Sequence, residues 1–262
     1  MPELPEVEVV RRSIAPYLEG TTVLEVFDIG SRFALPSLSG RAIKRVFRHG
    51  KCLFFEFFEN DALFVHLGMT GKFLLSETRI SFPHQHLIFY LSSGVFLSFC
   101  DQRKFGKIKY LTRKEKENFL ATLGIDPFSP AYTFERVGAL LSGKRRIKDF
   151  LLDQHKIAGI GNIYASEILF RSGIHPERKL LTLTGTEKGN LFLAIPAVLD
   201  EAIRCQGTTI RDFAQANGEK GSFQDCLAVY GREGEPCLRC GTPIARKVIG
   251  SRSTYFCPHC QK

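Results

Sequence analysis

The segment Cys237-Leu-Arg-Cys240, followed sixteen residues later by Cys257-Pro-His-Cys260, decides the architecture of the C-terminal end of the chain. Two C-x2-C pairs at this spacing form two turns, each presenting two thiolates to one tetrahedral zinc ion. Four thiolates leave no coordination position open, so this zinc is structural and replaces a core that a short segment cannot build. We therefore expect a zinc finger at residues 227–262.

Between the cysteine pairs, the stretch Ile249-Gly-Ser-Arg252-Ser-Thr-Tyr-Phe256 resembles the tip of a β-hairpin. Arg252 would lie where its side chain can reach into a groove. The zinc has no open coordination position for catalysis, so any function of the finger must come from the side chains that the finger presents.

Composition bounds the class of protein. The 262 residues are 44% hydrophobic and 24% charged, as in globular domains, and no apolar run approaches the length of a membrane span. The N-terminal residues alternate acids and apolar side chains, which is unlike a secretory signal. We expect a cytoplasmic protein with no membrane partner.

The chain carries a net charge of +9, which favours a polyanionic partner. Basic residues cluster at Arg41–Lys51, Arg103–Lys116 and Lys144–Lys148. The three clusters predict one phosphate-binding groove. The alternative, for each cluster taken singly, is a solvated face.

The order of sequence patterns predicts an α+β protein. An amphipathic helix at residues 3–18 precedes β-branched and aromatic runs at 22–111, and from Tyr132 onward the apolar period is helical. Phe54, Phe55, Phe57 and Phe58 break strict alternation, which indicates a sheet buried on both faces, in a sandwich or a closed barrel. Pro196 is expected to kink or split the last long helix. The expected divisions are an N-terminal domain at 1–122, a linker at 123–130, a helical domain at 131–226 and the finger.

Two further motifs carry chemistry. Gly159-Ile-Gly161-Asn162 predicts a helix, two-turn, helix arrangement in which Asn162 caps the following helix and backbone N–H groups favour a phosphate. At the N-terminus, removal of Met1 would expose Pro2 as a secondary amine, and α-amino groups titrate near 7.7–8.0. Such an amine can attack an aldehyde-level sugar carbon to form an iminium. Glu3 and Glu6 would converge with Pro2 at the helix start; the alternative is an ordinary proline and acids at a helix N-terminus.

Together the motifs resemble those of the formamidopyrimidine-DNA glycosylase family over essentially the whole chain. They occur in the family's order: Pro2-Glu-Leu-Pro-Glu-Val-Glu8, His49-Gly-Lys51, His66-Leu-Gly-Met69-Thr-Gly, Asp101-Gln-Arg103-Lys-Phe105-Gly, Gly159-Ile-Gly-Asn-Ile-Tyr-Ala and the finger. The resemblance implies a β-sandwich flanked by helices, a helix-two-turn-helix domain and a β-hairpin zinc finger.

The resemblance also implies an activity. It would be that of a bifunctional base-excision repair enzyme, which excises 8-oxoguanine and formamidopyrimidines from double-stranded DNA and cleaves the abasic strand by β,δ-elimination. By the match, Pro2 is the Schiff-base nucleophile, Glu3 the proton donor for opening the deoxyribose, and Glu6 a supporting acid. Lys51 would serve β-elimination and Arg252 δ-elimination. The family implies a bacterial monomer holding one structural zinc.

Base chemistry requires the lesion to leave the stack. The resemblance implies that Met69, Arg103 and Phe105 fill the resulting gap, since apolar wedges suit unstacked steps and an arginine can hydrogen-bond the orphaned base. The resemblance also implies contacts with the DNA backbone for His84, Lys144, Lys148 and Asn162. His66, which is expected at the end of a strand, is a further candidate for such a contact.

Departures from the family pattern affect lesion choice. Gln102 and Lys104 replace the usual Pro and Arg, and Ser222 stands where many relatives carry Tyr in the loop that covers the flipped base. Two alternatives stay open: an endonuclease VIII-type enzyme for oxidised pyrimidines, and a catalytically silent DNA-binding protein. Leu4 disfavours the first, and the intact Pro2 and Glu3 disfavour the second.

Overall fold

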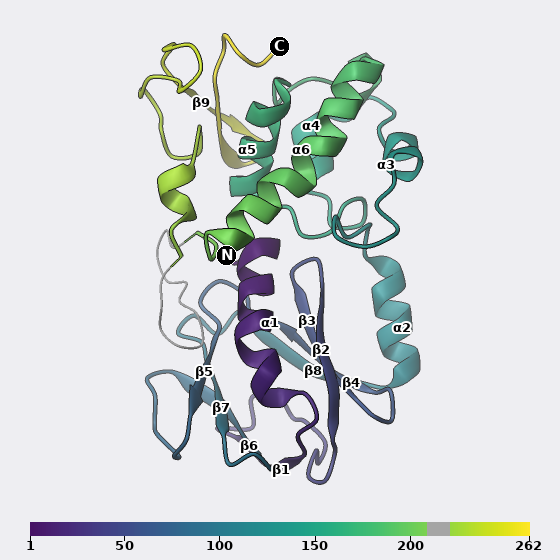
Figure 1. Cartoon of the computed structure of the whole chain (residues 1–262), viewed down its shortest axis with the longest axis vertical. Helices are drawn as coiled ribbons and strands as arrows, with labels where there is room; N and C mark the ends of the chain where they lie inside the picture. The colour runs from purple at the N-terminus through teal and green to yellow at the C-terminus, as the bar shows by residue number, and fades with distance from the viewer. Residues whose placement is uncertain (209–220) are drawn as a thin grey trace. The chain divides into compact units, whose positions relative to one another are not determined.

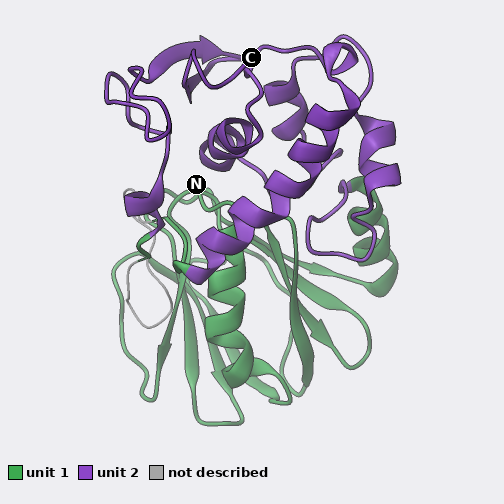
Figure 2. Ribbon diagram, turned by 45° about the horizontal axis from the view of Figure 1, so that its top comes forward, with its two compact units in different colours: residues 1–122, 205–222 green, residues 123–204, 223–262 purple. Residues whose placement is uncertain are grey.

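The computed structural model describes residues 1–208 and 221–262. These divide into two compact units, which Figure 2 shows in different colours. Unit 1 consists of residues 1–122 with 205–222, and unit 2 of residues 123–204 with 223–262. From the sequence we grouped 205–222 with the helical domain, whereas its described ends pack in unit 1. Within the described ranges, no helix has the length and apolarity to cross a membrane.

Unit 1 is built on two four-stranded antiparallel sheets, with orders β1-β6-β7-β5 and β2-β3-β4-β8 (Figure 1). The first sheet contains β1 (Val23–Asp28), β6 (Gln85–Leu91), β7 (Phe96–Cys100) and β5 (Lys72–Ser76). The second contains β2 (Ile43–His49), β3 (Cys52–Phe57), β4 (Ala62–His66) and β8 (Lys107–Leu111). Helix α1 (Leu4–Leu18) packs mainly on β2, and α2 (Arg113–Thr122) lies next to β8.

The phenylalanine run of β3 explains the layering. Every residue of β3 is buried. On one face Phe55 meets Phe73 and Phe89 of the other sheet, with ring centroids 5.6 and 6.4 Å away. On the opposite face Phe54 lies 6.2 Å from Phe119 of α2. The expected burial is confirmed for Phe54, Phe55 and Phe57, whereas Phe58 lies beyond the end of β3 and is 60% exposed. The two separate sheets make the fold a sandwich rather than a closed barrel.

Unit 2 is helical, with one hairpin near its C-terminal end. Its α-helices are α3 (Phe134–Leu140), α4 (Ile147–Leu151), α5 (Asn162–Ser172) and α6 (Gly185–Arg204). Two 3-10 turns, η1 (Leu180–Thr182) and η2 (Phe223–Cys226), precede the hairpin of β9 (Ala245–Ile249) and β10 (Arg252–Phe256). The expected α+β class is confirmed.

Pro196 does not split α6, which runs unbroken from Gly185 to Arg204. A proline lacks the N–H that would bond to the carbonyl four residues earlier, here Phe192. The Tyr132 hydroxyl donates to that carbonyl at 2.9 Å, and the two rings stack 4.7 Å apart. A side chain from outside the helix thus satisfies the oxygen, and the sequence expectation of a split is wrong.

The cysteines outside the finger differ in burial. Cys52 and Cys100 are buried, as expected of reduced core thiols, and burial raises the pKa of the Cys52 thiol to about 12. Cys205 is half-buried and Cys226 is exposed at the end of η2. Cys226 therefore lies outside the core.

Candidate active site and nucleic-acid interface

The N-terminus of α1 carries two buried carboxylates. Glu3 is the N-cap residue, and its backbone N–H donates to Glu6 Oε2 at 2.8 Å. Only 3% of Glu3 and 2% of Glu6 is exposed, and Pro2 is buried beside them. The structure therefore brings Pro2, Glu3 and Glu6 to one helix start, where the positive end of the helix dipole favours negative charge.

The other oxygen of Glu6 holds a distant segment. Glu6 Oε1 accepts the Thr208 N–H at 2.9 Å and the Thr208 hydroxyl at 3.0 Å. Gly207 has φ +77°, and a Cβ there would approach Glu6 Oε1 to 3.0 Å. At the far end of the segment, a Cβ on Gly221 would stand 2.2 Å from the Gly207 carbonyl oxygen. Close backbone approach thus needs glycine at both ends, a feature with no local signal in the sequence.

Lys51 lies in the turn that joins β2 to β3. Gly50 supplies the positive φ of 57° that this turn requires. The next residue, Cys52, pairs in register with His66 of β4. Lys51 and His66 therefore share one end of the β2-β3-β4-β8 sheet, and Lys51 is largely buried there.

His66 is held by its own loop. Its Nδ1 accepts the Gly68 N–H at 3.1 Å, which assigns the ring proton of the neutral form to Nε2. Desolvation, followed by the charges of Lys51 and Lys107, lowers the pKa of His66 below its usual value. Burial and the two neighbouring lysines thus disfavour protonation of His66.

Asp101 joins the two loops that carry the expected wedge residues. Its Oδ1 accepts the Thr70 hydroxyl at 2.6 Å, while Oδ2 accepts the Gly106 N–H at 2.8 Å and an Arg32 N–H at 3.0 Å. Thr70 Oγ1 in turn accepts the Arg103 N–H at 3.0 Å. Burial alone would raise the pKa of Asp101, but these hydrogen bonds and Arg32 hold it below its usual value. No role for Asp101 was predicted from the sequence, although Asp101 is the first residue of the motif that contains Arg103 and Phe105.

The loops approach so closely that Gly68 has no room for a side chain. A Cβ at Gly68 would lie 2.5 Å from the Phe105 backbone carbon. Met69 is 38% exposed and Phe105 52% exposed, and the Arg103 guanidinium lies 5.0 Å from the Phe105 ring centroid. Behind them is a cavity of about 540 Å³. The exposed His84 joins the same region, since its carbonyl accepts the Asp101 N–H at 2.9 Å.

In unit 2 the two candidate lysines differ sharply. Lys144 is exposed, whereas Lys148 is fully buried. The Lys148 ammonium donates to the Thr254 hydroxyl and, at 3.5 Å, to the Ser253 carbonyl. Desolvation, together with the charge of Arg252, lowers the pKa of Lys148 to about 8. The structure thus places the Lys148 ammonium inside unit 2, whereas the sequence led us to expect it at the DNA backbone.

Asn162 is likewise turned toward the hairpin. Helix α5 begins at Asn162 itself, and Gly161 is the N-cap residue without a side-chain cap. The expectation that Asn162 caps α5 is therefore wrong. Its Nδ2 donates to the Ser253 carbonyl at 2.9 Å, which joins the start of α5 to β10.

The finger contains a site that fits zinc. The sulfur atoms of Cys237, Cys240, Cys257 and Cys260 all lie within 4.8 Å of one another. The Cys237–Cys260 and Cys240–Cys257 separations are 3.9 and 3.5 Å. Zn–S bonds of about 2.3 Å at tetrahedral angles require sulfurs about 3.8 Å apart. This donor set confirms the expected structural zinc.

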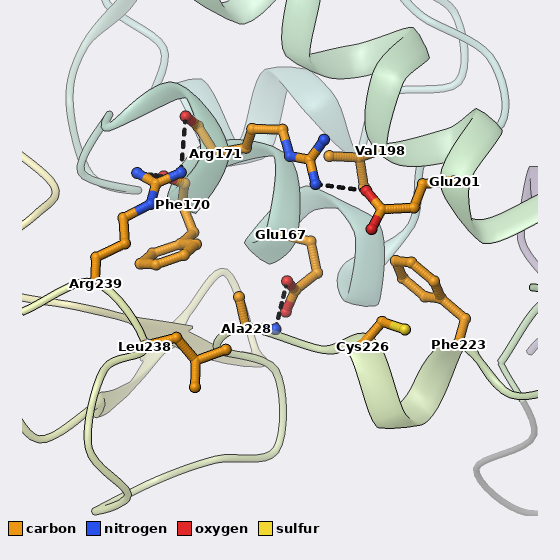
Figure 3. Close-up of a pocket in the computed structure, with 10 residues that line it drawn as sticks. All are labelled: Glu167, Phe170, Arg171, Val198, Glu201, Phe223, Cys226, Ala228, Leu238 and Arg239. Carbon is orange, nitrogen blue, oxygen red and sulfur yellow. Dashed lines mark hydrogen bonds and ion pairs between the residues drawn. The ribbon is translucent and has the colours of Figure 1, made fainter. Parts of the chain in front are cut away.

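A buried carboxylate anchors the approach to the finger (Figure 3). Glu167 of α5 accepts the backbone N–H groups of Ala228, Val229 and Tyr230 at 2.8–3.0 Å. Nearby, the Arg239 guanidinium lies 4.3 Å from the Phe170 ring centroid and donates to the Phe170 carbonyl at 3.1 Å. The finger is thereby tied to the helix that Asn162 begins.

The expected hairpin is confirmed, and its turn has two residues. Gly250 and Ser251 have φ of 57° and 61°, the signature of a type I′ turn. Arg252 follows directly, pairs in register with Ile249 and is exposed. The structure therefore presents Arg252 beside the hairpin tip.

Comparison with known proteins matches three regions of the chain to domain families. Residues 1–108 match the formamidopyrimidine-DNA glycosylase N-terminal domain, 123–214 its H2TH domain, and 234–262 a zinc finger found in FPG and IleRS. Formamidopyrimidine-DNA glycosylases from Pelotomaculum thermopropionicum and Gluconobacter oxydans are each 42% identical, covering the whole of this chain and 99% and 100% of theirs. The MutM (Fpg) crystal structure from Thermus thermophilus has a TM-score of 0.88 at 40% identity over 99% of this chain and 98% of its own.

Solved complexes extend the likeness to DNA. A complex of Lactococcus lactis Fpg with DNA containing an abasic site has a TM-score of 0.90 at 32% identity, covering 99% of each chain. Sandwich, H2TH region and zinc finger together define a DNA repair glycosylase. The chain belongs to the formamidopyrimidine-DNA glycosylase family, whose members are glycosylase/AP lyases of base-excision repair.

Proposed function

We propose that this protein excises oxidised purines, 8-oxoguanine and formamidopyrimidines, and cleaves the resulting abasic strand by β,δ-elimination. The main observation that supports this proposal is that Glu3 and Glu6 are both buried at the helix start next to Pro2. Binding DNA does not require two buried carboxylates at a helix start, whereas a reaction at the N-terminal amine uses them.

Pro2 acts as the nucleophile once Met1 is removed. Its secondary amine attacks C1′ of the damaged nucleotide, the base departs, and a cationic iminium joins protein and sugar. Glu3 supplies the proton that opens the deoxyribose ring. Glu6 positions this centre, since it accepts the Glu3 N–H at 2.8 Å and fixes Thr208 with its other oxygen.

Strand cleavage uses two basic residues. Lys51 serves β-elimination, in which loss of the C2′ proton expels the 3′ phosphate. Arg252 serves δ-elimination, in which the 5′ phosphate leaves. Lys51 is supported by its place in the β2–β3 turn, and Arg252 by its exposure next to the hairpin tip. All residues used belong to one chain, and we propose that it acts as a monomer in the cytoplasm.

Met69 and Phe105 insert into the stack and Arg103 meets the orphaned base. Two exposed apolar side chains on adjoining loops, with a guanidinium over one ring, support these roles. His66, His84, Lys144 and Asn162 contact the DNA backbone in this proposal.

Lesion choice has a second candidate within the family. One solved complex of wild-type Lactococcus lactis FPG, with a TM-score of 0.89 to this chain, contains an oxidised pyrimidine in its DNA. Oxidised pyrimidines are therefore the alternative substrate class.

A side-by-side excision assay separates the two candidates. We expect single-turnover excision of 8-oxoguanine opposite cytosine, and of formamidopyrimidine, to exceed excision of thymine glycol by at least about tenfold. Quenched-flow sampling on three otherwise identical duplexes measures the rates. Equal or faster excision of thymine glycol would show that oxidised pyrimidines are the preferred substrates.

Asp101→Asn tests the loop junction. The amide has one acceptor oxygen in place of two, so if that oxygen accepts from the Gly106 N–H and Arg32 it cannot also accept the Thr70 hydroxyl, and the charge that pairs with Arg32 is lost. We therefore expect a loss of about 1–3 kcal/mol in the free energy of unfolding and weaker DNA binding. A carboxyl whose folded pKa lies below its unfolded value stabilises the fold above the unfolded pKa and ceases to do so as pH falls through the folded one. The difference from wild type should therefore be full at pH 7 and shrink below about pH 4.

Denaturant melts at pH 7 and pH 3 measure this difference. Glu117→Gln is the control, because it removes the same charge from an exposed ion pair with Arg113 on α2. An Asp101→Asn protein as stable as Glu117→Gln at pH 7 would show that Asp101 does not hold the loops.

A further inference from the structure

The fully buried Lys148 is a costly feature. Moving an ammonium from water into a protein interior carries a large desolvation penalty unless hydrogen bonds offset it. The two acceptors of Lys148 Nζ are the Thr254 hydroxyl and the Ser253 carbonyl, both in β10. A lysine whose role was to meet phosphate would gain nothing from this burial, because its charge would be remote from the polyanion.

Arg252 shares a face of β10 with Thr254. Side chains of residues i and i+2 in a strand project to the same side, so Arg252 projects on the side that carries Thr254 and Lys148. The charge of Arg252 contributes to the lowered pKa of Lys148, which agrees with this proximity. Like charges repel, and the buried ammonium therefore disfavours a folded-back guanidinium.

The intervening backbone is fixed as well. The Ser253 carbonyl accepts from Lys148 Nζ at 3.5 Å and from Asn162 Nδ2 at 2.9 Å. Ser253 directly follows Arg252, so the backbone one residue beyond Arg252 is held from both α4 and α5. The adjoining turn is packed too, since a Cβ on Gly250 would lie 3.0 Å from Asp149 Oδ1.

We propose that Lys148, through Thr254 and the Ser253 carbonyl, is a positioning residue that aims Arg252, and that it does not contact DNA phosphate. The inference rests on the proposed function, in which Arg252 serves δ-elimination. It predicts a specific defect: the second elimination step slows while DNA binding, Schiff-base formation and the first elimination proceed.

Thr254 offers a matched pair of variants. Thr254→Val keeps the shape of the side chain and removes the hydroxyl, whereas Thr254→Ser keeps the hydroxyl. On an abasic duplex we expect Thr254→Val to lower the rate of the δ step about tenfold, because small misplacements of a catalytic group are costly. The β step should change less than twofold, and Thr254→Ser should restore the wild-type ratio. Denaturing gels resolve the β product, which ends in an unsaturated sugar, from the δ product, which ends in phosphate.

Lys144 and Lys148 provide the second comparison. Each phosphate contact adds about one to the slope of log affinity against log salt concentration. We expect Lys144→Met to reduce this slope by about one and leave the ratio of δ to β product unchanged. Lys148→Met should leave the slope unchanged and lower the product ratio. Zinc content and thermal melts of each variant establish that the finger stays folded.

The outcomes separate the inference from the proposed function. Wild-type protein that gives no borohydride-trapped complex on abasic DNA would defeat the proposed function itself. Normal trapping together with a wild-type product ratio in Thr254→Val would overturn the positioning role. So would a Lys148→Met variant that loses one unit of salt slope and keeps its product ratio, since that result identifies a phosphate contact. If Thr254→Val unfolds the finger, Lys148→Met decides by the same two readouts.

Discussion

Pro2→Gly is expected to lower borohydride trapping on an abasic duplex at least about 100-fold. A secondary amine yields an iminium that is cationic at every pH, whereas the imine of a primary amine needs an added proton before it becomes a comparable electron sink. Glycine also frees a backbone that the proline ring restrains at the start of α1. Trapping kinetics on denaturing gels measure the loss, and mass spectrometry of the purified protein checks that Met1 has been removed.

Pro5 supplies the matched control for this experiment. It lies in the first turn of the same helix, and its backbone carries no terminal amine. Pro5→Ala should trap within about twofold of wild type, and both variants should bind abasic DNA with affinities near that of wild type. Undiminished trapping by Pro2→Gly would show that the secondary amine of Pro2 is not required, and peptide mapping of the trapped complex would then distinguish the new primary terminal amine from Lys51 as the attached group.

Features written into local sequence could be predicted. The spacing of the four cysteines predicted a zinc site, and the sulfur separations confirm it. The phenylalanine run of β3 predicted a sheet covered on both faces, because strands with one wet face alternate polar and apolar residues. In each case the physical requirement acts over a few neighbouring residues.

Features that depend on distant partners could not be predicted. Glu6 and Thr208 are 202 residues apart, and nothing near either residue indicates their hydrogen bond. The Tyr132 hydroxyl that satisfies Phe192 lies outside the helix that Pro196 was expected to break. Lys148 sits in a basic run that looks like a solvated face, and only the packing of β10 shows that its ammonium is buried.

The lysine pair shows why residue type alone misleads at a DNA-binding surface. Lys144 and Lys148 have the same chemistry and are one helical turn apart in number, yet one is exposed and the other buried. Charge composition predicts affinity for a polyanion, which is a property of the whole surface. The role of an individual cation depends on which acceptors surround it.

Cys240→Ser is expected to release zinc and, with it, the folded finger. Structural zinc contributes about 10–16 kcal/mol in small finger peptides, because the ordered site exists only with the metal. Small core clusters, such as Phe170 with Val229, Cys237, Ile244 and Cys257, cannot replace that contribution. We expect DNA affinity to fall at least about tenfold and δ-elimination to be lost, since Arg252 is displayed by the hairpin between the cysteine pairs.

Cys226→Ser is the control, because Cys226 is exposed at the end of η2 and lies outside the four-sulfur cluster. It should retain one zinc per chain and wild-type product ratios. Metal analysis after dialysis, fluorescence anisotropy on abasic DNA and product gels give the three readouts. A Cys240→Ser protein that loses zinc yet still completes δ-elimination at the wild-type rate would show that the metal does not hold Arg252 in place. Loss of δ product with β product preserved would instead separate the two ends of the chain by function: the amine at Pro2 forms the covalent bond, and the zinc finger enables the last cleavage.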